Sequence, residues 1–329
     1  MTSFLDPAIL FFVFGIAAGL LKSNLEIPPQ ISRFLSLYLL MALGLKGGFA
    51  LAKSGLTAEV SISLACALLL ATLIPLLGYA VLRRFLNGFD AAALAATYGS
   101  VSAVTFITAV QYLDTRGVEF GGHMAAAMAL MESPAIVLAV LLANAARRKV
   151  AVPNTAANRT EAPAQNTSIG KLLHEALTDG AQLLLLGAML VGMLTGESGR
   201  VAMQPFAGDL FKGMLAFFLL DMGLLAARNM GGLKGKSAWL LAYAIGAPLV
   251  HATLALGLAW AVGMSVGNAT LLTVLAASAS YIAVPAVIRH AIPEAEPSLY
   301  FGMSLGLTFP FNILVGISLY AGAARWALG

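Results

Sequence analysis

The chain has 329 residues, of which 60% are hydrophobic and only 10% are charged, and its mean hydropathy is +0.88. A soluble domain of this length needs a far more charged surface, so these values exclude one and predict a membrane protein. The net charge of +4 does not predict a nucleic-acid partner, because basic residues in membrane proteins usually set the orientation of the spans.

Uncharged apolar runs recur along the chain and are separated by turn residues and charges. A helix needs about 20 such residues to cross the hydrocarbon core of a bilayer. The sequence therefore predicts an all-α membrane protein with ten transmembrane helices. The predicted spans are residues 7–22, 31–52, 57–83, 91–113, 120–146, 170–196, 207–228, 237–263, 268–290 and 297–325.

The second predicted span contains a basic residue, Lys46. A charge at the centre of a membrane helix costs about 2.5 to 3.5 kcal/mol on insertion scales, so its retention needs a reason. Two interpretations stay open. The long side chain reaches the membrane interface, or it pairs with Asp221 of the seventh span.

The fourth predicted span loses its apolar character near its middle, over residues 97–102, which predicts a broken helix. Backbone groups left unpaired at that depth need a polar cavity enclosed by protein. The N-termini of half-helices suit an anion, and hydroxyl groups add neutral donors. The candidate substrate-binding residues of this span are Gly99, Ser100, Ser102 and Thr105.

Two acidic residues also lie within predicted spans. Glu132 is at the centre of the fifth span beside Ser133 and Pro134, and Asp221 is in the seventh. One hypothesis makes these acids sites for a coupled cation or proton, and the other gives them structural hydrogen bonds to neighbouring helices. With Lys46 they form the set of candidate coupling-ion or intramembrane charge residues.

A stretch rich in Ala, Asn, Thr and Pro follows the fifth span and cannot bury enough apolar area to fold. It divides the chain into a first five-helix repeat (1–146), a flexible cytoplasmic linker (147–168) and a second repeat (169–329). Lys and Arg residues are more numerous at the span ends on the side of this linker. Because positively charged loops stay in the cytoplasm, both termini are predicted to lie outside.

The ninth predicted span loses its apolar character in the same way, over residues 278–281, and Pro285 follows. The candidate substrate-binding residues there are Ser278, Ala279 and Ser280. An alternative is that the small residues of both clusters only permit close helix packing. We favour binding, because packing alone need not place both clusters at mid-span.

Three pairs of segments recur in the same order at separations of 176 to 181 positions. They are 43–45 with 222–224, 95–100 with 276–281, and Pro134 with Pro310. Because each half holds an odd number of spans, the second half must enter the membrane upside down. The sequence thus predicts a 5+5 inverted repeat with broken fourth and ninth helices, an architecture common in secondary transporters.

Asn312, two positions after Pro310, is predicted to cap backbone groups freed by that proline. No cofactor is predicted, and no metal beyond a candidate coupling Na+. A serine enzyme is not favoured, because Gly-x-Ser-x-Gly is absent and no histidine lies beside either serine cluster. Four histidines show no metal-ligand spacing and are interpreted as interfacial: His123, His174, His251 and His290.

At these residues the sequence resembles the sodium-dependent bicarbonate transporter family of cyanobacterial carbon-concentrating systems, nearly from end to end. The resemblance is carried by residues 98–105, 131–135, 276–280, 292–293, 296–298 and Tyr300. It implies that the broken fourth and ninth helices cross. It also implies a homotrimer in a bacterial inner membrane, sodium-coupled uptake of bicarbonate, and regulation by a PII-like cytoplasmic partner.

The sequence departs from the family pattern at both clusters. Tyr281 stands where the family has an acid, and a phenol is a much poorer sodium ligand than a carboxylate. Ala103 and Val104 stand where Gly and Ser are expected, which makes the predicted anion pocket more apolar. The leading hypothesis is a permease for bicarbonate or a similar small anion. The alternatives are a sodium-independent or proton-coupled carrier of a small organic anion, and a sensor without transport.

Overall fold

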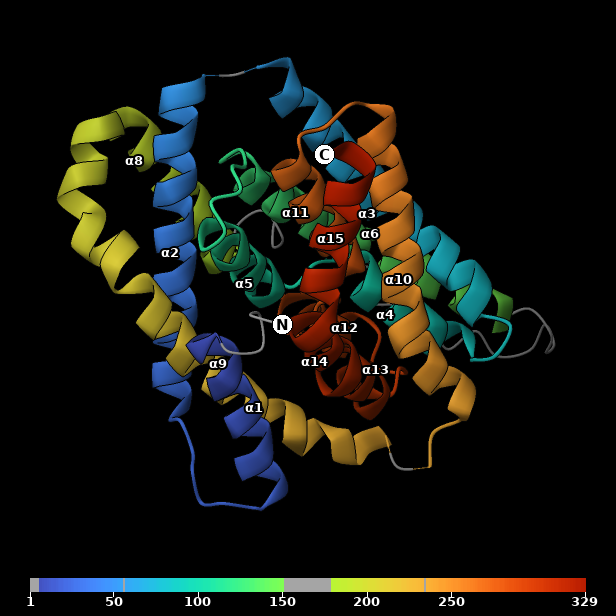
Figure 1. Cartoon of the computed structure of the whole chain (residues 1–329). Helices are drawn as coiled ribbons and strands as arrows, with labels where there is room; N and C mark the ends of the chain where they lie inside the picture. Colours follow the sequence, from blue (N-terminus) through green and yellow to red (C-terminus); the bar gives the residue numbers. More distant parts are fainter. Residues whose placement is uncertain (1–5, 56, 151–178, 234) are drawn as a thin grey trace.

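The computed structural model describes residues 6–55, 57–150, 179–233 and 235–329, and all regular structure in these ranges is helical (Figure 1). The predicted all-α membrane protein is confirmed. Two shorter apolar helices, Pro7–Leu20 and Val266–Ala277, accompany seven described stretches that are long and apolar enough to cross a membrane. Those seven are Pro29–Ser54, Ala58–Leu82, Gly88–Asp114, Met124–Arg147, Gly180–Met230, Ala238–Ala261 and Pro297–Leu328.

The first half of the chain begins its helices with recognisable start signals. Prolines open the first two helices, where the missing N–H would have had no helical partner. Asp6 and Asn87 cap α1 and α4 by accepting backbone N–H groups. The predicted fourth span is two helices, α4 and α5. The helices are α1 (Pro7–Leu20), α2 (Pro29–Ser54), α3 (Ala58–Leu82), α4 (Gly88–Gly99), α5 (Ala103–Asp114) and α6 (Met124–Val150).

The second half also contains a broken span, and its last span is interrupted as well. The predicted ninth span is two helices, α11 and α12. Wide π-helical turns, Ser304–Thr308 and Asn312–Gly316, flank Pro310 in the last span. The helices are α8 (Gly180–Met203), α9 (Phe211–Met230), α10 (Ala238–Ala261), α11 (Val266–Ala277), α12 (Ala283–Ala291), α13 (Pro297–Met303), α14 (Phe309–Phe311) and α15 (Ile317–Leu328).

The region between the halves differs in part from the prediction. Helix α6 continues to Val150, into the predicted linker 147–168. The rest of that linker and the first residues of the predicted sixth span fall in 151–178, outside the described residues. Helix α8 changes direction at Gly196, whose φ of 53° and ψ of −134° favour glycine, and this is where the sixth span was predicted to end.

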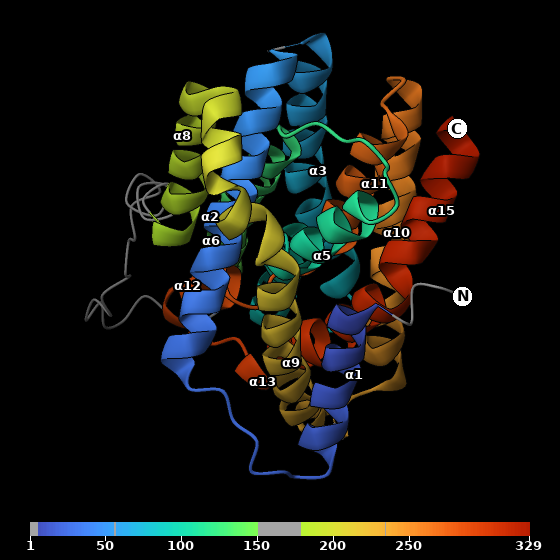
Figure 2. The same ribbon diagram turned by 60° about the vertical axis from the view of Figure 1, so that its left-hand side comes forward.

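Small residues allow very close packing of α1 on α9 and of α2 on α8 (Figures 1 and 2). A Cβ atom at Gly15 would collide with the backbone of Leu220, and one at Gly48 with that of Met189. Such close backbone contact is a main source of helix association in membranes. We call α1, α2, α8 and α9 the flanking group.

The remaining helices pack into a second group, which we call the crossing group because it contains both broken helices. Helices α3, α4 and α6 contact one another, and α11 contacts both α10 and α15. The flanking group meets this group along α6, α5 and the last span. Both views show α8 and α2 on one side of the molecule and α10 on the other (Figures 1 and 2).

Candidate functional site at the crossing of the two broken helices

The interruptions of the two broken helices contact each other inside the protein. The N–H of Ser102, at the start of α5, donates to Oγ of Ser278 at 2.9 Å. The N–H of Ser280, between α11 and α12, donates to the carbonyl oxygen of Thr97 on α4 at 2.8 Å. All four residues are buried. The predicted break in each helix is therefore present, and the two breaks cross.

Several hydroxyl groups selected from the sequence stabilise this crossing. Ser278 Oγ donates to the carbonyl oxygen of Leu275 at 2.8 Å and accepts from the Ser102 N–H. Thr105 donates its hydroxyl to Ser102 Oγ at 3.0 Å. Ser102 also accepts from the Thr105 N–H at 3.2 Å, so it caps α5. These bonds satisfy backbone groups that the interruptions would otherwise leave unpaired.

The last span supplies a side chain to the end of α11. Asn312 Nδ2 donates to the carbonyl oxygen of Ala277 at 2.8 Å, and Tyr320 donates its hydroxyl to Asn312 Oδ1 at 2.9 Å. Asn312 is fully buried. Asn312 thus caps a backbone group, as predicted, but that group is at the end of α11 and is not one freed by Pro310.

A cavity of about 250 Å³, which we call the crossing cavity, lies against both interruptions. Of the residues selected from the sequence, Ser102, Ser280 and Glu132 line it. The others do not line it: Gly99, Ser100, Thr105, Ser278 and Ala279. Gly99 instead packs against the ring of Pro75 on α3, with no room for a side chain.

Sequence reasoning did not select several polar groups of this cavity. Gln182 on α8 donates from Nε2 to Glu132 Oε2 at 2.6 Å, and Asp179, the N-cap of α8, is nearby in the cavity wall. Asp179 and Gln182 both follow the predicted linker. Gln182 is the one polar side chain in the apolar run 181–194. A single amide in a long apolar run could therefore have identified Gln182 as a candidate site residue.

Tyr281 also lines the crossing cavity. Its side chain packs against Phe309 with ring centroids 5.0 Å apart, and only 5% of its surface is exposed. Its hydroxyl lies near Ser102 but makes no hydrogen bond to a described residue. A buried donor without a partner is costly, so this hydroxyl is available for a ligand.

The charges of the crossing cavity come from two different sources. Among the described lining residues the ionisable acids are Glu132 and Asp179, and no Lys or Arg is present. The N-terminal ends of α5 and α12 also face the cavity, through residues 102–104 and Ala283. Helix N-termini carry partial positive charge and unpaired N–H groups. The cavity thus offers positive backbone ends and separate carboxylates.

The two other intramembrane charges lie away from this cavity. Lys46 Nζ is 3.3 Å from Asp114 Oδ2 and 4.2 Å from the centre of the Phe211 ring, so its partner is not Asp221. Asp221 is buried on α9, and its Oδ2 has no hydrogen-bond partner among the described residues. The pairing of Lys46 with Asp221 was wrong because the sequence does not show which helices are neighbours.

The interfacial interpretation of the histidines was wrong for two of them. His123 and His251 are buried, with 4% and 6% exposure. The imidazole of His251 faces the backbone of Ala276 at the end of α11. His174 and the side chain of His290 lie outside the described residues. Within the described chain, no three His, Cys, Asp or Glu residues form a group that could hold a metal ion.

The chain matches the sequence model of a family described as the Na+-dependent bicarbonate transporter superfamily, over residues 7–325. The match covers both broken helices and every lining residue of the crossing cavity. No curated protein matches the chain significantly.

Proposed function

Because the chain belongs to the Na+-dependent bicarbonate transporter superfamily, we propose that it is a secondary-active permease for bicarbonate or a similar small anion. The family supports a membrane transporter and points away from an enzyme. Among the described residues that line the crossing cavity there is no histidine to activate a serine hydroxyl. The crossing cavity is the proposed binding site.

The observation that carries this proposal is the combination of two helix N-termini with an unpartnered donor. The N-terminal ends of α5 and α12 face the same cavity as the Tyr281 hydroxyl. An anion there accepts hydrogen bonds from backbone N–H groups, from this phenol and from the hydroxyl of Ser102. The breaks in the helices thereby create the site and also lie where the membrane would otherwise exclude charge.

The proposed coupling group is Glu132, with Asp179 in the same cavity wall. A carboxylate is a good hard-oxygen ligand for Na+, and it also takes up a proton, so either ion neutralises it. Without such neutralisation, a carboxylate repels the substrate anion across a small cavity of low dielectric constant. Cation binding at Glu132 therefore favours anion binding. Asp221 and Lys46 stay weaker proposals for this role, because neither lines the cavity.

The proposed architecture is a 5+5 inverted repeat, with residues 1–146 and 169–329 as the two halves and 147–168 as a cytoplasmic linker. Two packing relations support it. Helix α1 packs on α9 as α8 packs on α2, and α3 packs on α4 as α10 packs on α11. In each relation, replacing both helices of one contact by the helices five spans away in the chain gives the other contact.

The remaining parts of the proposal are carried by the family resemblance. They are a homotrimer in a bacterial inner membrane, both termini outside, Na+ as the coupling ion, and a PII-like cytoplasmic regulator. Lys and Arg residues at the span ends on the linker side support the orientation.

A second candidate substrate is a small organic carboxylate. The lining of the crossing cavity is mainly apolar, with Val101, Ala103, Val104, Met128 and Leu185 among its residues. Bicarbonate has no apolar part that could contact these side chains, whereas a short aliphatic carboxylate has one. Burial of apolar surface contributes about 25 cal/mol per Å², so the organic anion gains affinity that bicarbonate does not.

Uptake into proteoliposomes tests the function. Labelled bicarbonate, acetate and butyrate are supplied with a Na+ gradient, with a proton gradient, or with neither. Saturable uptake that depends on one of the gradients supports the proposal, and the preferred anion decides between the two substrates. Absence of saturable uptake of all three anions under every condition contradicts it.

A further inference from the structure

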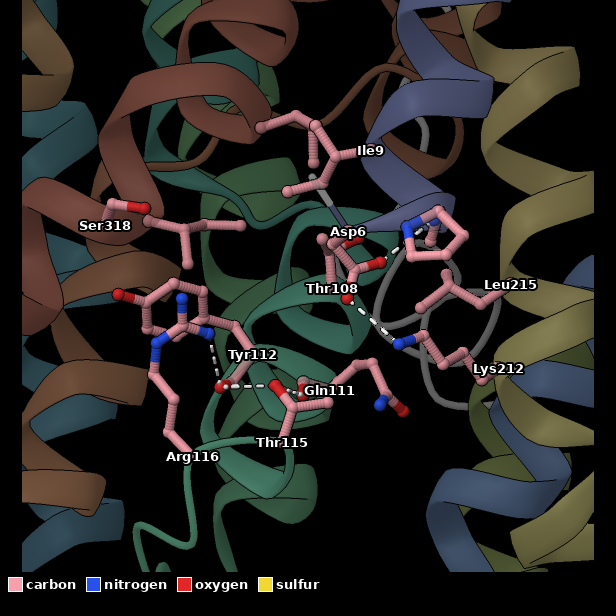
Figure 3. Close-up of a pocket in the computed structure, with 14 residues that line it drawn as sticks. Asp6, Ile9, Thr108, Gln111, Tyr112, Thr115, Arg116, Lys212, Leu215 and Ser318 are labelled. Carbon is pink, nitrogen blue, oxygen red and sulfur yellow. Dashed lines mark hydrogen bonds and ion pairs between the residues drawn. The ribbon is translucent and has the colours of Figure 1, made fainter. Parts of the chain in front are cut away.

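A second cavity, of about 330 Å³, lies at the other end of α5 (Figure 3). The crossing cavity contains the N-terminal end of α5, whereas this one contains its C-terminal half and the following turn, from Thr108 to Arg116. The start of α1, the start of α9 and the last span complete the walls. The two cavities share no lining residue. We call the second one the basic cavity.

The basic cavity and the crossing cavity are lined by different charged side chains. Lys212 and Arg116 line the basic cavity together with one acid, Asp6, whereas the described lining of the crossing cavity holds two acids and no base. A concave site lined by an excess of one sign of charge concentrates ions of the opposite sign. Of the two bases, Lys212 is the one that we consider as an anion ligand, because Arg116 makes further contacts within the protein.

The donors of this cavity are only partly used within the protein. Lys212 Nζ is 3.1 Å from Asp6 Oδ2, and the lysine side chain is 42% exposed. An ammonium group has three N–H donors, so this ion pair leaves others for a ligand. The side-chain amide of Gln111 lies in the same view and makes no hydrogen bond to a described residue (Figure 3).

Local contacts fix two of the charged side chains in the cavity wall. The guanidinium of Arg116 stacks on the ring of Tyr112, 3.6 Å from its centre, and also donates to the Tyr112 carbonyl oxygen at 3.2 Å. Asp6 Oδ1 accepts the N–H of Ala8, so the same carboxylate that pairs with Lys212 caps α1. The carboxylate of Asp6 is therefore held in place, and its side chain is less exposed than that of Lys212 beside it.

We propose that the basic cavity is a recruitment site for a small monovalent oxyanion, bicarbonate or a short carboxylate, which binds Lys212 and Gln111. It rests on the proposed function only in that the recruited anion is the transported one. Asp6 acts as an internal competitor, because its carboxylate occupies the lysine when no anion is bound. Removal of the Asp6 charge therefore tightens anion binding, and removal of the Lys212 charge weakens it.

Chloride is the probe for this site, since the width of its nuclear magnetic resonance signal reports exchange with a protein-bound ion. The purified full chain in detergent broadens the signal, and added bicarbonate or formate narrows it again. Lys212→Gln lowers chloride affinity at least about tenfold, the loss expected for one charge-assisted hydrogen bond. Asp6→Asn raises the affinity several-fold, because asparagine keeps the helix cap without the charge.

Lys212→Arg is the matched control for folding, because it keeps both the charge and the contact with Asp6, and it binds chloride like the wild type. Equal chloride affinity of wild type and Lys212→Gln overturns the proposal, as does a loss of affinity in Asp6→Asn. Failure of both bicarbonate and formate to displace chloride overturns it too, because the site then takes no oxyanion.

The result of the chloride-binding test can be told apart from the result of the uptake test. Glu132→Gln leaves the effects of the Lys212 and Asp6 substitutions on chloride binding in place while it removes coupled uptake. If the wild type carries no anion into proteoliposomes but the two substitutions still change chloride affinity in opposite directions, the recruitment site stands and the transport proposal fails.

Discussion

Gln182 of α8 donates a 2.6 Å hydrogen bond to Glu132 of α6, and this bond joins the flanking group to the crossing group at the wall of the crossing cavity. The proposed transport by alternating access requires one helix group to move relative to another around the binding site. Such a movement breaks or remakes this bond. In the proposed mechanism a cation or proton on Glu132 changes the bond as well, which links the occupancy of Glu132 to the position of the two groups.

Substitution of Glu132 by Gln removes the charge on which coupling depends and keeps the size of the side chain. We expect gradient-driven uptake to fall at least about tenfold, because every 1.4 kcal/mol of lost cation affinity is a factor of ten. Exchange of labelled for unlabelled anion without a gradient is retained. Both are measured in proteoliposomes.

The matched control is Glu197→Gln, on an exposed residue that pairs with Arg200 and lies outside both cavities. It changes uptake little. Full gradient-driven uptake by the Glu132 variant would remove that residue from the coupling mechanism.

Substitution of Tyr281 by Phe removes a hydroxyl that has no hydrogen-bond partner among the described residues, and it keeps the contact with Phe309. The KM for the transported anion rises at least about tenfold, since a hydrogen bond to a charged group contributes roughly 1.5 to 3 kcal/mol. The melting temperature does not fall. An unchanged KM would show that the phenol does not contact the anion, and a large loss of stability would indicate a structural role.

Substitution of Asn312 by Ala leaves the Ala277 carbonyl and the Tyr320 hydroxyl without partners in a buried site. Unfolding free energy falls by about 1 to 3 kcal/mol, the cost of unsatisfied buried polar groups. Thermal or denaturant unfolding in detergent measures it. Tyr320→Phe removes only the second bond and costs less. Equal stability of Asn312→Ala and the wild type contradicts the assigned cap.

The helix breaks were predictable because they need only local information. Two apolar spans contain short polar runs, with Thr, Tyr, Gly and Ser at residues 97–102 and Ser at residues 278 and 280. Such a run marks a position where a membrane helix loses its apolar character and can be interrupted. Asn312 was predictable for a similar reason, since a buried amide near a proline has few uses other than hydrogen bonding to backbone groups.

The lining of the cavity was not predictable to the same extent, because it depends on which helices are neighbours. Ser278 looked equivalent to Ser280, yet its hydroxyl is used within the crossing and only Ser280 reaches the cavity. Gln182 becomes part of the site only because α8 packs beside α6. Lys46 pairs with Asp114 and not with Asp221, again because the sequence does not show which helices are neighbours.

Two ion pairs hold the loop between α12 and α13, and they predict a pH dependence of stability. Glu294 lies 2.7 Å from Arg147, and Glu296 lies 2.7 Å from Lys236. Hydrogen bonds from these bases lower the pKa of both carboxyls. A carboxyl with a lowered folded pKa stabilises the fold fully above its unfolded pKa, about 4.3, and loses that contribution as the pH falls through the folded value.

Both pairs are partly exposed, so each contributes about 1 kcal/mol or less and is weakened by salt. Thermal unfolding is followed between neutral pH and the acid range for the wild type and for Glu294→Gln with Glu296→Gln. The melting temperature of the wild type is higher than that of the double variant at neutral pH, and this difference disappears as the pH falls below the unfolded pKa. An advantage that grows in acid contradicts the assigned sign.

Anion binding in the crossing cavity is tested by two experimental density maps, one with and one without the anion at a concentration that saturates uptake. If the crossing cavity binds the transported anion, new density appears there, between the Tyr281 hydroxyl and the N-terminal ends of α5 and α12. No density there, under conditions in which the same preparation transports the anion, would contradict it.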